Sequence, residues 1–242
     1  MKNNNIKKYF RRINKEKLSE KVSAQIQNLI LSDKIKIGDK LPSERELTNL
    51  FGVSRVVVRE ALQSMEQVGL VETRKGTQNG TYVVFNLYKP FFNSMNILFH
   101  EGKLSLQDFT DVRMAIECLS VKLAALNAKE KDILLLKRIN DQLLDDTIDV
   151  IKSSEINDNF HVAIADISGN TLIKVIVKSS LELLNSLASA NSDAQKVRKN
   201  LLQNHNAIIE AINEKDVERC EELMAIDVGF TKYLIPYNRS NM

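Results

Sequence analysis

The stretch Pro42 to Leu62, PSERELTNLFGVSRVVVREAL, constrains the fold more than any other part of the sequence. Ser43 followed three residues later by Glu46 is a capping box, so a helix is expected to begin there. Gly52 supplies a turn, and Ser54 is a natural N-cap for a second helix. Two short helices joined by a glycine turn predict a helix-turn-helix.

The flanking segments extend this motif. Residues 18–32 carry apolar side chains at helical spacing, which predicts an amphipathic helix before the motif. After it, residues 70–74 and 81–85 have strand character, and the connection KGTQNG between them predicts a hairpin with an Asn-Gly corner. Three helices followed by a β-hairpin predict a winged helix-turn-helix over residues 18–85.

The rest of the chain is expected to be entirely helical, so the fold class is mainly α. From Ser105 onward no strand pattern occurs, and the breaks between helical patterns are short, as in a helical bundle. The expected helices cover residues 105–128, 130–147, 149–168, 171–190, 194–213 and 216–234. The domain prediction is a basic tail (1–17), the winged helix-turn-helix (18–85), a linker with a short helix (86–103), an all-α domain (104–235) and a C-terminal tail (236–242).

Composition and charge narrow the class of protein. Hydrophobic residues make up 43% and charged residues 27% of the chain, which fits a packed core. No apolar run is long enough to span a bilayer, no secretory leader is recognisable, and Cys118 and Cys220 give no disulfide framework. We therefore expect a cytoplasmic protein without a membrane partner.

Charge is unevenly distributed between the two expected domains. The segment through Asn86 contains 16 Lys and Arg against 9 Asp and Glu, a net charge of +7, whereas the remainder contains 18 against 22, a net charge of −4. A basic N-terminal part indicates a polyanionic partner.

Arg55 and Arg59 lie one turn apart near the start of the second helix of the motif. Cations at a helix N-terminus are unfavourable by about 0.3–1 kcal/mol, so some interaction is expected to compensate for them. Guanidinium groups that fork onto guanine O6 and N7 in the major groove would do so. Ordinary solvated arginines at the surface are the alternative interpretation.

The order of residues here resembles the N-terminal domain of the GntR family of bacterial transcription regulators. The resemblance rests on Gly38-Asp39, LPSERELT, Gly-Val-Ser-Arg, VREA and Gly-Thr in the wing. It implies a homodimer that binds an inverted-repeat operator in double-stranded DNA. The DNA-contacting residues it implies are Arg45, Ser54, Arg55, Arg59 and, in the minor groove, Lys75 and Gly76.

This sequence departs from the family pattern in the DNA-binding domain. Val56 and Val57 stand where many relatives have a hydroxyl residue, so one phosphate or thymine contact is apolar here. The wing is lengthened by Gln-Asn-Gly at 78–80.

A second resemblance covers residues 104–234, which are similar to the FCD ligand-binding domain of FadR-like GntR regulators. It rests on VRMAIECLSVKLAA, NDNFHVAIADISGN and NHNAIIEAINEKDVERCEELM. In many relatives this bundle holds a divalent metal on one Asp or Asn and three His, beside a small carboxylate effector. The corresponding residues here are Asn157, His161, His205 and Asp227, an oxygen-richer set that suits Zn²⁺, Mn²⁺ or Ni²⁺. The alternatives are a decayed site that binds its effector without metal, or a substitute ligand from Asp158.

Arg113 is the candidate effector-binding residue. It lies on an apolar stripe, where an unpaired charge is costly, and a carboxylate ligand could pair with it bidentately. An internal salt bridge to Glu117, one turn further on, is an equally weighted alternative.

The function predicted from these features is that of a dimeric, effector-responsive transcription regulator, most often a repressor in this family, and not an enzyme. One rival hypothesis makes the helical domain a dimerisation module only. A second makes His161, His205 and Asp227 a hydrolytic metal site, although no general base or nucleophile motif accompanies them. A third is nucleic-acid binding without sequence preference.

Overall fold

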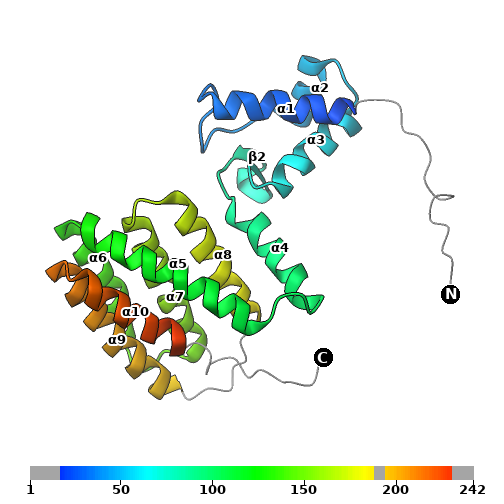
Figure 1. The fold of residues 1–242 in the computed structure, drawn as a ribbon. Helices are drawn as coiled ribbons and strands as arrows, with labels where there is room; N and C mark the ends of the chain where they lie inside the picture. Colours follow the sequence, from blue (N-terminus) through cyan, green and yellow to red (C-terminus); the bar gives the residue numbers. More distant parts are fainter. Residues whose placement is uncertain (1–16, 188–193, 231–242) are drawn as a thin grey trace, which may run out of the picture. The chain divides into compact units, whose positions relative to one another are not determined.

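The computed structural model describes residues 17–187 and 194–230, which form two compact units, Met1–Leu87 and Tyr88–Met242 (Figure 1). The fold class is mainly α, as predicted. Residues 1–16 of the expected tail at 1–17, the expected tail at 236–242, and the expected helix ends at 188–190 and 231–234 lie outside the described residues. Within the described part, no helix is long and apolar enough to cross a membrane.

The first unit is a winged helix-turn-helix, and its three predicted helices and hairpin are confirmed. The two strands pair antiparallel, with Val71 opposite Val83 and Arg74 opposite Gly80. The elements are α1 Leu18–Leu31, α2 Glu44–Phe51, α3 Arg55–Gln67, β1 Val71–Arg74, the 3₁₀ turn η2 Gly76–Gln78 and β2 Gly80–Val83.

One apolar core holds this unit together. Each helix contributes one apolar stripe at helical spacing, and each strand contributes one inward-facing residue. Through these side chains α3 packs against both α1 and α2. The buried members are Val22, Ile26, Ile30, Leu41, Leu47, Val58, Ala61, Leu62, Met65, Leu70, Val71 and Val83.

The caps expected from the sequence are present at both motif helices. Ser43 accepts from the backbone of Glu46 while the Glu46 carboxylate accepts from the backbone of Ser43, which completes the capping box. Ser54 accepts from the backbone N–H of Val57 at 3.4 Å. Gly52 ends α2 with φ +65°, a left-handed conformation that costs a side-chain-bearing residue about 1 kcal/mol or more. These signals are local, which is why the sequence places the turn correctly.

The wing differs from the expected Asn-Gly corner. The connection closes through one 3₁₀ turn over Gly76–Gln78, and Gly80 already belongs to β2. Six residues are too many for a two-residue corner, so the turn forms earlier in the segment. The Lys40 Nζ donates to the carbonyl of Asn79 at 2.7 Å and packs against Gly80, which steadies the tip from the side.

Two backbone contacts mark the end of the first unit and the beginning of the second. Gly69 has φ +77°, and a Cβ there would lie 2.1 Å from the carbonyl oxygen of Asn86. The Asn86 N–H donates to the Gly69 carbonyl at 2.7 Å, so the two ends of the hairpin are tied together. Just after it, the Tyr88 carbonyl accepts from the Ser179 hydroxyl at 2.8 Å, within the second unit.

The second unit is a helical bundle with no strand among its described residues. The predicted bundle helices are observed, and the short linker helix is longer than expected, because it begins at Tyr88 and ends at His100. The elements are α4 Tyr88–His100, α5 Leu106–Asn127, α6 Glu130–Asp141, η3 Gln142–Leu144, α7 Val150–Ile167, α8 Thr171–Leu187, α9 Ala194–Glu214 and α10 Val217–Phe230.

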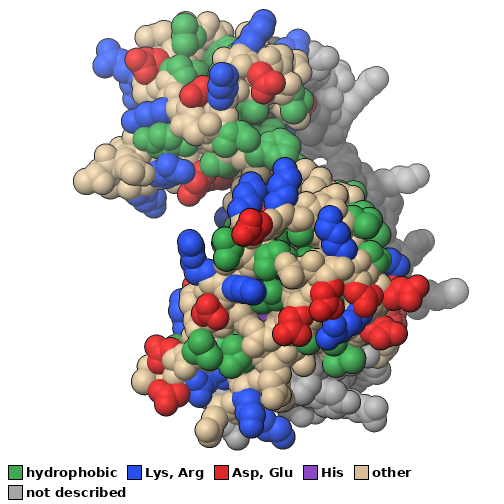
Figure 2. Space-filling model, turned by 90° about the vertical axis from the view of Figure 1, so that its left-hand side faces the viewer, with side chains coloured by type: hydrophobic (Ala, Val, Ile, Leu, Met, Phe, Trp, Pro, Cys, Tyr) green, Lys and Arg blue, Asp and Glu red, His purple; other side chains and the backbone are tan. Residues whose placement is uncertain are grey.

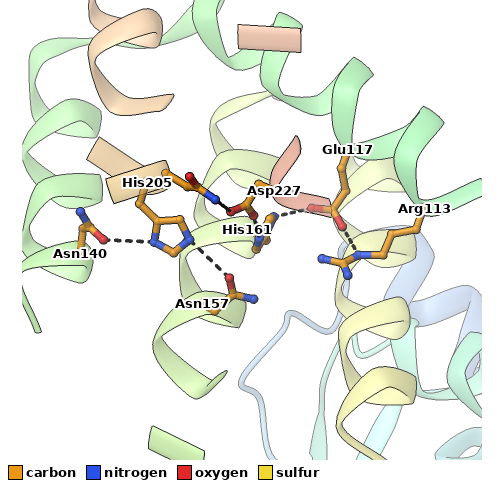
Figure 3. A network of polar contacts seen from close by, with 8 residues as sticks. Arg113, Glu117, Asn140, Asn157, His161, His205 and Asp227 are labelled. Carbon is orange, nitrogen blue, oxygen red and sulfur yellow. Dashed lines mark hydrogen bonds and ion pairs between the residues drawn. The ribbon is translucent and has the colours of Figure 1, made fainter. Parts of the chain in front are cut away.

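Helix α5 is shared by the two main apolar clusters of the bundle. One cluster joins α5 to α6, α7, α9 and α10, and includes Val121 and Met224. The other joins α5 to α7 and α8, and α4 packs against it through Phe92 and Met95. Between these layers lies a group of buried polar side chains (Figure 3).

Candidate metal centre and nucleic-acid interface

The predicted DNA-contacting arginines are all exposed on the helix-turn-helix. Arg45 lies in α2, Arg55 is the first residue of α3, and Arg59 follows one turn later. The Ser54 hydroxyl oxygen caps α3, and its own hydrogen can still be donated to a phosphate. Exposed cations beside a helix N-terminus form a suitable surface for an anionic backbone.

Arg59 makes a contact that the sequence did not predict. Its Nη2 lies 3.0 Å from Glu44 Oε2 and its Nε lies 3.4 Å from Glu44 Oε1, with both side chains substantially exposed. The hydrogen bonds that Arg59 donates to Glu44, and the charge of that carboxylate, raise the pKa of Arg59. Glu44 therefore offsets part of the unfavourable electrostatic energy expected for a cation near the N-terminus of α3.

The wing presents Lys75 and Gly76 to solvent. Gly76 has φ +82° and open space around its Cα, so the backbone at this point could approach another molecule closely. The guanidinium of Arg74 lies over the ring of Tyr82, 4.5 Å from its centroid, as in a cation–π contact. On the face drawn in Figure 2, the first unit carries separate Lys and Arg side chains, whereas acidic side chains gather on the second unit.

All four predicted metal-binding residues come together inside the bundle. Asn157 and His161 lie one turn apart on α7, His205 comes from α9, and Asp227 comes from α10; each is at most 8% exposed. One ligand atom from each of the two histidines and Asp227 can be chosen so that all three lie within 4.8 Å of one another. Figure 3 shows these side chains directed toward one another.

His161 lies between two carboxylates. Its Nε2 is 3.0 Å from Asp227 Oδ2, and its Nδ1 contacts Glu117 Oε2. Burial lowers the pKa of His161, but the two carboxylates outweigh it and raise that pKa to about 10. Within the described residues neither ring nitrogen has a hydrogen bond of good geometry, although both lie at ion-pair distance.

The orientation of His205 is fixed by the Asn140 amide. The amide nitrogen of Asn140 donates to Asn206 at 2.8 Å, so its oxygen faces His205 Nδ1 at 3.1 Å and accepts from it. His205 Nε2 therefore carries a lone pair, and it lies 3.3 Å from Asn157 Oδ1. Burial lowers the pKa of His205 to about 3, and the ring of Phe160 stacks on it at 3.8 Å.

Asp227 is the most acidic member of the group. Burial raises its pKa, but His161 outweighs that effect and lowers the pKa to about 2. Asn204 donates to its other oxygen at 3.3 Å, which holds the carboxylate in place. A charged, oriented carboxylate stands where the commonest family pattern has a histidine, and it occupies a ligand-like position.

The geometry fits a divalent cation. Ligand atoms about 2.1 Å from a tetrahedral Zn²⁺ are about 3.4 Å apart. His161 Nε2 lies 3.0 Å from Asp227 Oδ2 and His205 Nε2 lies 3.3 Å from Asn157 Oδ1, and the atoms of the two histidines and Asp227 lie within 4.8 Å of one another. Facing lone pairs on His205 and Asn157 repel, and a cation bound to both atoms, or rotation of the Asn157 amide, removes that repulsion. A cation at His161 Nε2 would take the place of its proton, while Glu117 would keep its contact with Nδ1.

Arg113 forms the internal salt bridge to Glu117, one of the two interactions considered for it. It is 3% exposed, and its Nε contacts Glu117 Oε1. Glu117 thereby connects Arg113 to His161, and burial raises its pKa less than these two cations lower it. Asp158 is not in the group of possible ligands, and its carboxylate accepts from Asn185 at 2.5 Å. It still borders the centre: burial raises its pKa, while hydrogen bonds to Asn185 and Asn157 and the charges of His161 and Arg113 lower it.

Sequence reasoning missed three residues of this centre. Glu117 was considered only as a partner of Arg113, and Asn140 and Asn204 were not considered. Asn140 continues the buried stripe of Ile133 and Leu136 on α6, and a polar residue at such a core position is a usable signal. Asn204 precedes His205 directly, but its neighbour across the bundle is visible only in the fold.

A winged helix-turn-helix joined to a helical bundle with a buried polar centre defines a DNA-binding transcription regulator. The GntR model of bacterial regulatory proteins matches residues 18–83, and the FCD domain model matches residues 108–228. The chain belongs to the GntR family and carries an FCD domain.

Relatives and solved structures agree with this assignment. The "HTH-type transcriptional repressor NanR" of Citrobacter rodentium is 30% identical over 224 residues, covering 87% of this chain and 82% of that protein. The protein of the same name from Salmonella schwarzengrund is 30% identical over 221 residues, covering 87% and 81%. The structure of Streptococcus agalactiae GntR is similar in fold, with a TM-score of 0.57 at 22% identity, covering 89% of this chain and 99% of that one.

Proposed function

We propose that this regulator is a homodimeric repressor that binds an inverted-repeat operator and responds to a small carboxylate bound beside a divalent metal in its FCD domain. The observation that carries the proposal is the convergence of Asn157, His161, His205 and Asp227 in a regulator of this family. The name of the relatives, transcriptional repressor, supports the direction of control.

In the proposed complex, α3 lies in the major groove of each half-site. Arg55 and Arg59 would read guanines, and Ser54 and Arg45 would contact the backbone or a base edge. Lys75 and Gly76 at the wing would enter the adjacent minor groove. Their exposure and their position on two neighbouring elements support this arrangement.

Within the bundle, the metal would be held by one amide oxygen, two imidazoles and one carboxylate, a donor set suited to Zn²⁺, Mn²⁺ or Ni²⁺. When bound, it would supply a position that accepts an oxygen of the effector. The residues around it hold the rings in place: Glu117 at His161 and Asn140 at His205. Such outer partners typically change metal affinity by about 10–100-fold.

Arg113 remains the proposed anchor for the effector. Its salt bridge to Glu117 is compatible with this role, because a bound carboxylate could exchange with Glu117 at the guanidinium. A small carboxylate beside the metal would compete for this cation and change the balance of charge at Glu117. We propose that this competition is the first step by which effector binding alters the protein.

Helix α5 offers a route from this input to the DNA-binding unit. Arg113 and Glu117 lie on the same helix as Phe109, which belongs to the apolar cluster that also receives Phe92 and Met95 of α4. A shift of α5 would displace α4, because the two helices share this cluster. Helix α4 follows the winged unit directly in the chain. Half-site spacing on DNA is fixed near 34 Å per turn, so a changed spacing of the two α3 helices weakens the complex.

The same helix also offers a surface for the homodimer. Val112, Ala115, Leu119 and Leu126 are exposed on α5, and a helix with apolar residues on all sides is expected to be covered. Val112 and Leu126 lie seven residues on either side of Leu119. In an antiparallel pair centred on Leu119, each Val112 would meet Leu126 of the second copy, as a two-fold axis requires.

The test begins with selection of an operator from random duplex DNA by the full chain. The expected product is an inverted repeat whose binding to the protein weakens on titration with small carboxylates in the presence of Zn²⁺, Mn²⁺ or Ni²⁺. An operator that no carboxylate affects, with no carboxylate-induced rise in thermal midpoint, would leave the bundle as a dimerisation module. Equal affinity for every sequence would contradict the regulator model itself.

A further inference from the structure

Glu44 and Arg59 connect the two helices of the helix-turn-helix at its exposed surface. Glu44 is the first residue of α2 and Arg59 is in the second turn of α3. Their contact has two points, 3.0 Å between Arg59 Nη2 and Glu44 Oε2, and 3.4 Å between Nε and Oε1. Glu44 thus meets one edge of the planar guanidinium.

The choice of edge has a chemical consequence. A guanidinium offers a side fork, made of Nε and Nη2, and an end fork, made of Nη1 and the outer hydrogen of Nη2. Glu44 takes the side fork and leaves the end fork pointing away from the carboxylate. The end fork is the pair of donors that can address guanine O6 and N7 together in the major groove.

Arg45 and Arg55 lack such a support. In the described part of the chain, neither has a carboxylate within ion-pair distance. Arg59 is therefore the one arginine of these three whose guanidinium is oriented before any contact with DNA. Orientation in advance reduces the side-chain entropy that binding has to remove.

We infer that Glu44 is a positioning residue for sequence reading: it holds the Arg59 end fork toward guanine and repels DNA wherever that guanine is absent. The inference rests on the proposed function. Both effects act in one direction, because a phosphate that competes for Arg59 must displace Glu44, and the carboxylate itself disfavours the polyanion. Glu44 therefore raises discrimination between sequences while it lowers affinity for DNA in general.

The experiment compares the full-length protein with its Glu44→Gln, Arg59→Ala and double variants on the selected operator. Each operator guanine is replaced in turn by 7-deazaguanine, which removes N7, and binding to random duplex is measured in parallel. For the wild type, replacing one particular guanine in each half-site should lower the affinity for the operator about 10-fold. For Arg59→Ala, the same replacement should leave the affinity unchanged. Glu44→Gln should reduce that 10-fold effect to about 2–3-fold and bind random duplex several-fold more tightly.

Two controls separate positioning from charge and from folding. Glu60→Gln removes the same charge next to Arg59 in sequence. Among the described residues Glu60 makes no ion pair with Arg59, so this change should leave the 7-deazaguanine effect at its wild-type value. In the Arg59→Ala background, Glu44→Gln should have no further effect on discrimination, because Glu44 acts through Arg59. Thermal midpoints within the error of the wild type show that the variants fold.

Full retention of the 7-deazaguanine effect in Glu44→Gln overturns the inference and leaves the proposed function standing. So does an equal loss in Glu60→Gln, since charge alone would then explain it. A wild type without any sequence preference overturns both the inference and the proposed function.

Discussion

His161 on α7 and Asp227 on α10 meet with Nε2 3.0 Å from Oδ2, at a point where both side chains are almost inaccessible to water. The pair brings a histidine and a carboxylate within bonding reach of one ion. Under the proposed function, the Asp227 carboxylate would take the place of the family histidine as a ligand, because it lies inside the same centre. The expected behaviour of the protein follows from this pair and from the surfaces described above.

The untagged protein is expected to contain about one divalent metal per chain. His161→Ala removes an inward nitrogen ligand and should lose that metal, whereas His100→Ala changes an exposed histidine on α4 and should retain it. Elemental analysis of the three purified proteins measures this. Metal at the same level in wild type and His161→Ala would place the ion elsewhere, and its absence from all three would support a metal-free effector site anchored by Arg113.

Arg55→Ala is expected to cost about 1–3 kcal/mol of base discrimination. Arg55 is exposed at the first position of α3, so its loss removes base contacts without disturbing the core. Fluorescence anisotropy on operator and random duplexes measures the two affinities. Equal weakening on both would assign Arg55 to the phosphate backbone.

Val56 is expected to contact the C5-methyl group of a thymine. It is 66% exposed at the second position of α3, between the two arginines, and an apolar side chain there suits a methyl group in the major groove. Burial of one methyl contributes about 0.8 kcal/mol, so replacing that thymine by uracil should weaken binding about fourfold. Val56→Ala should be insensitive to the replacement. If every uracil-containing operator binds as tightly as the parent, Val56 makes no such contact.

Leu119→Glu is expected to dissociate the homodimer. A charge at the centre of the exposed α5 surface would be buried twice in a two-fold interface. Leu134→Glu is the matched control, since Leu134 is 56% exposed on α6, outside this surface. Sedimentation velocity reports the mass of each variant. A dimeric Leu119→Glu protein would exclude α5 as the contact.

Local signals allowed much of the fold to be predicted. The predicted capping serines at 43 and 54 begin helices where the sequence indicated, because a cap satisfies backbone donors of its own helix and needs no distant partner. The wing shows the limit of such signals. An Asn-Gly pair favours a corner, but the length of the connection decided where the turn formed.

The polar centre could be predicted only in part. The family resemblance supplied all four residues, Asn157, His161, His205 and Asp227, and the one-turn spacing of the first two was consistent with it. The contact between Glu117 and His161 could not be inferred, since it depends on how α5 packs against α7. Spacing within α5 related Glu117 only to Arg113, and that salt bridge is the alternative that the structure contains.

The junction between the two units is short along the chain. Asn86 is tied to Gly69 on one side, Tyr88 is tied to Ser179 on the other, and Leu87 is the single residue between them. Under the proposed function, a shift of α4 would have to reach the winged unit through this one residue. Lengthening the chain after Leu87 by a few glycines should therefore uncouple the two units. Operator and effector would still bind, but binding of one would no longer alter binding of the other.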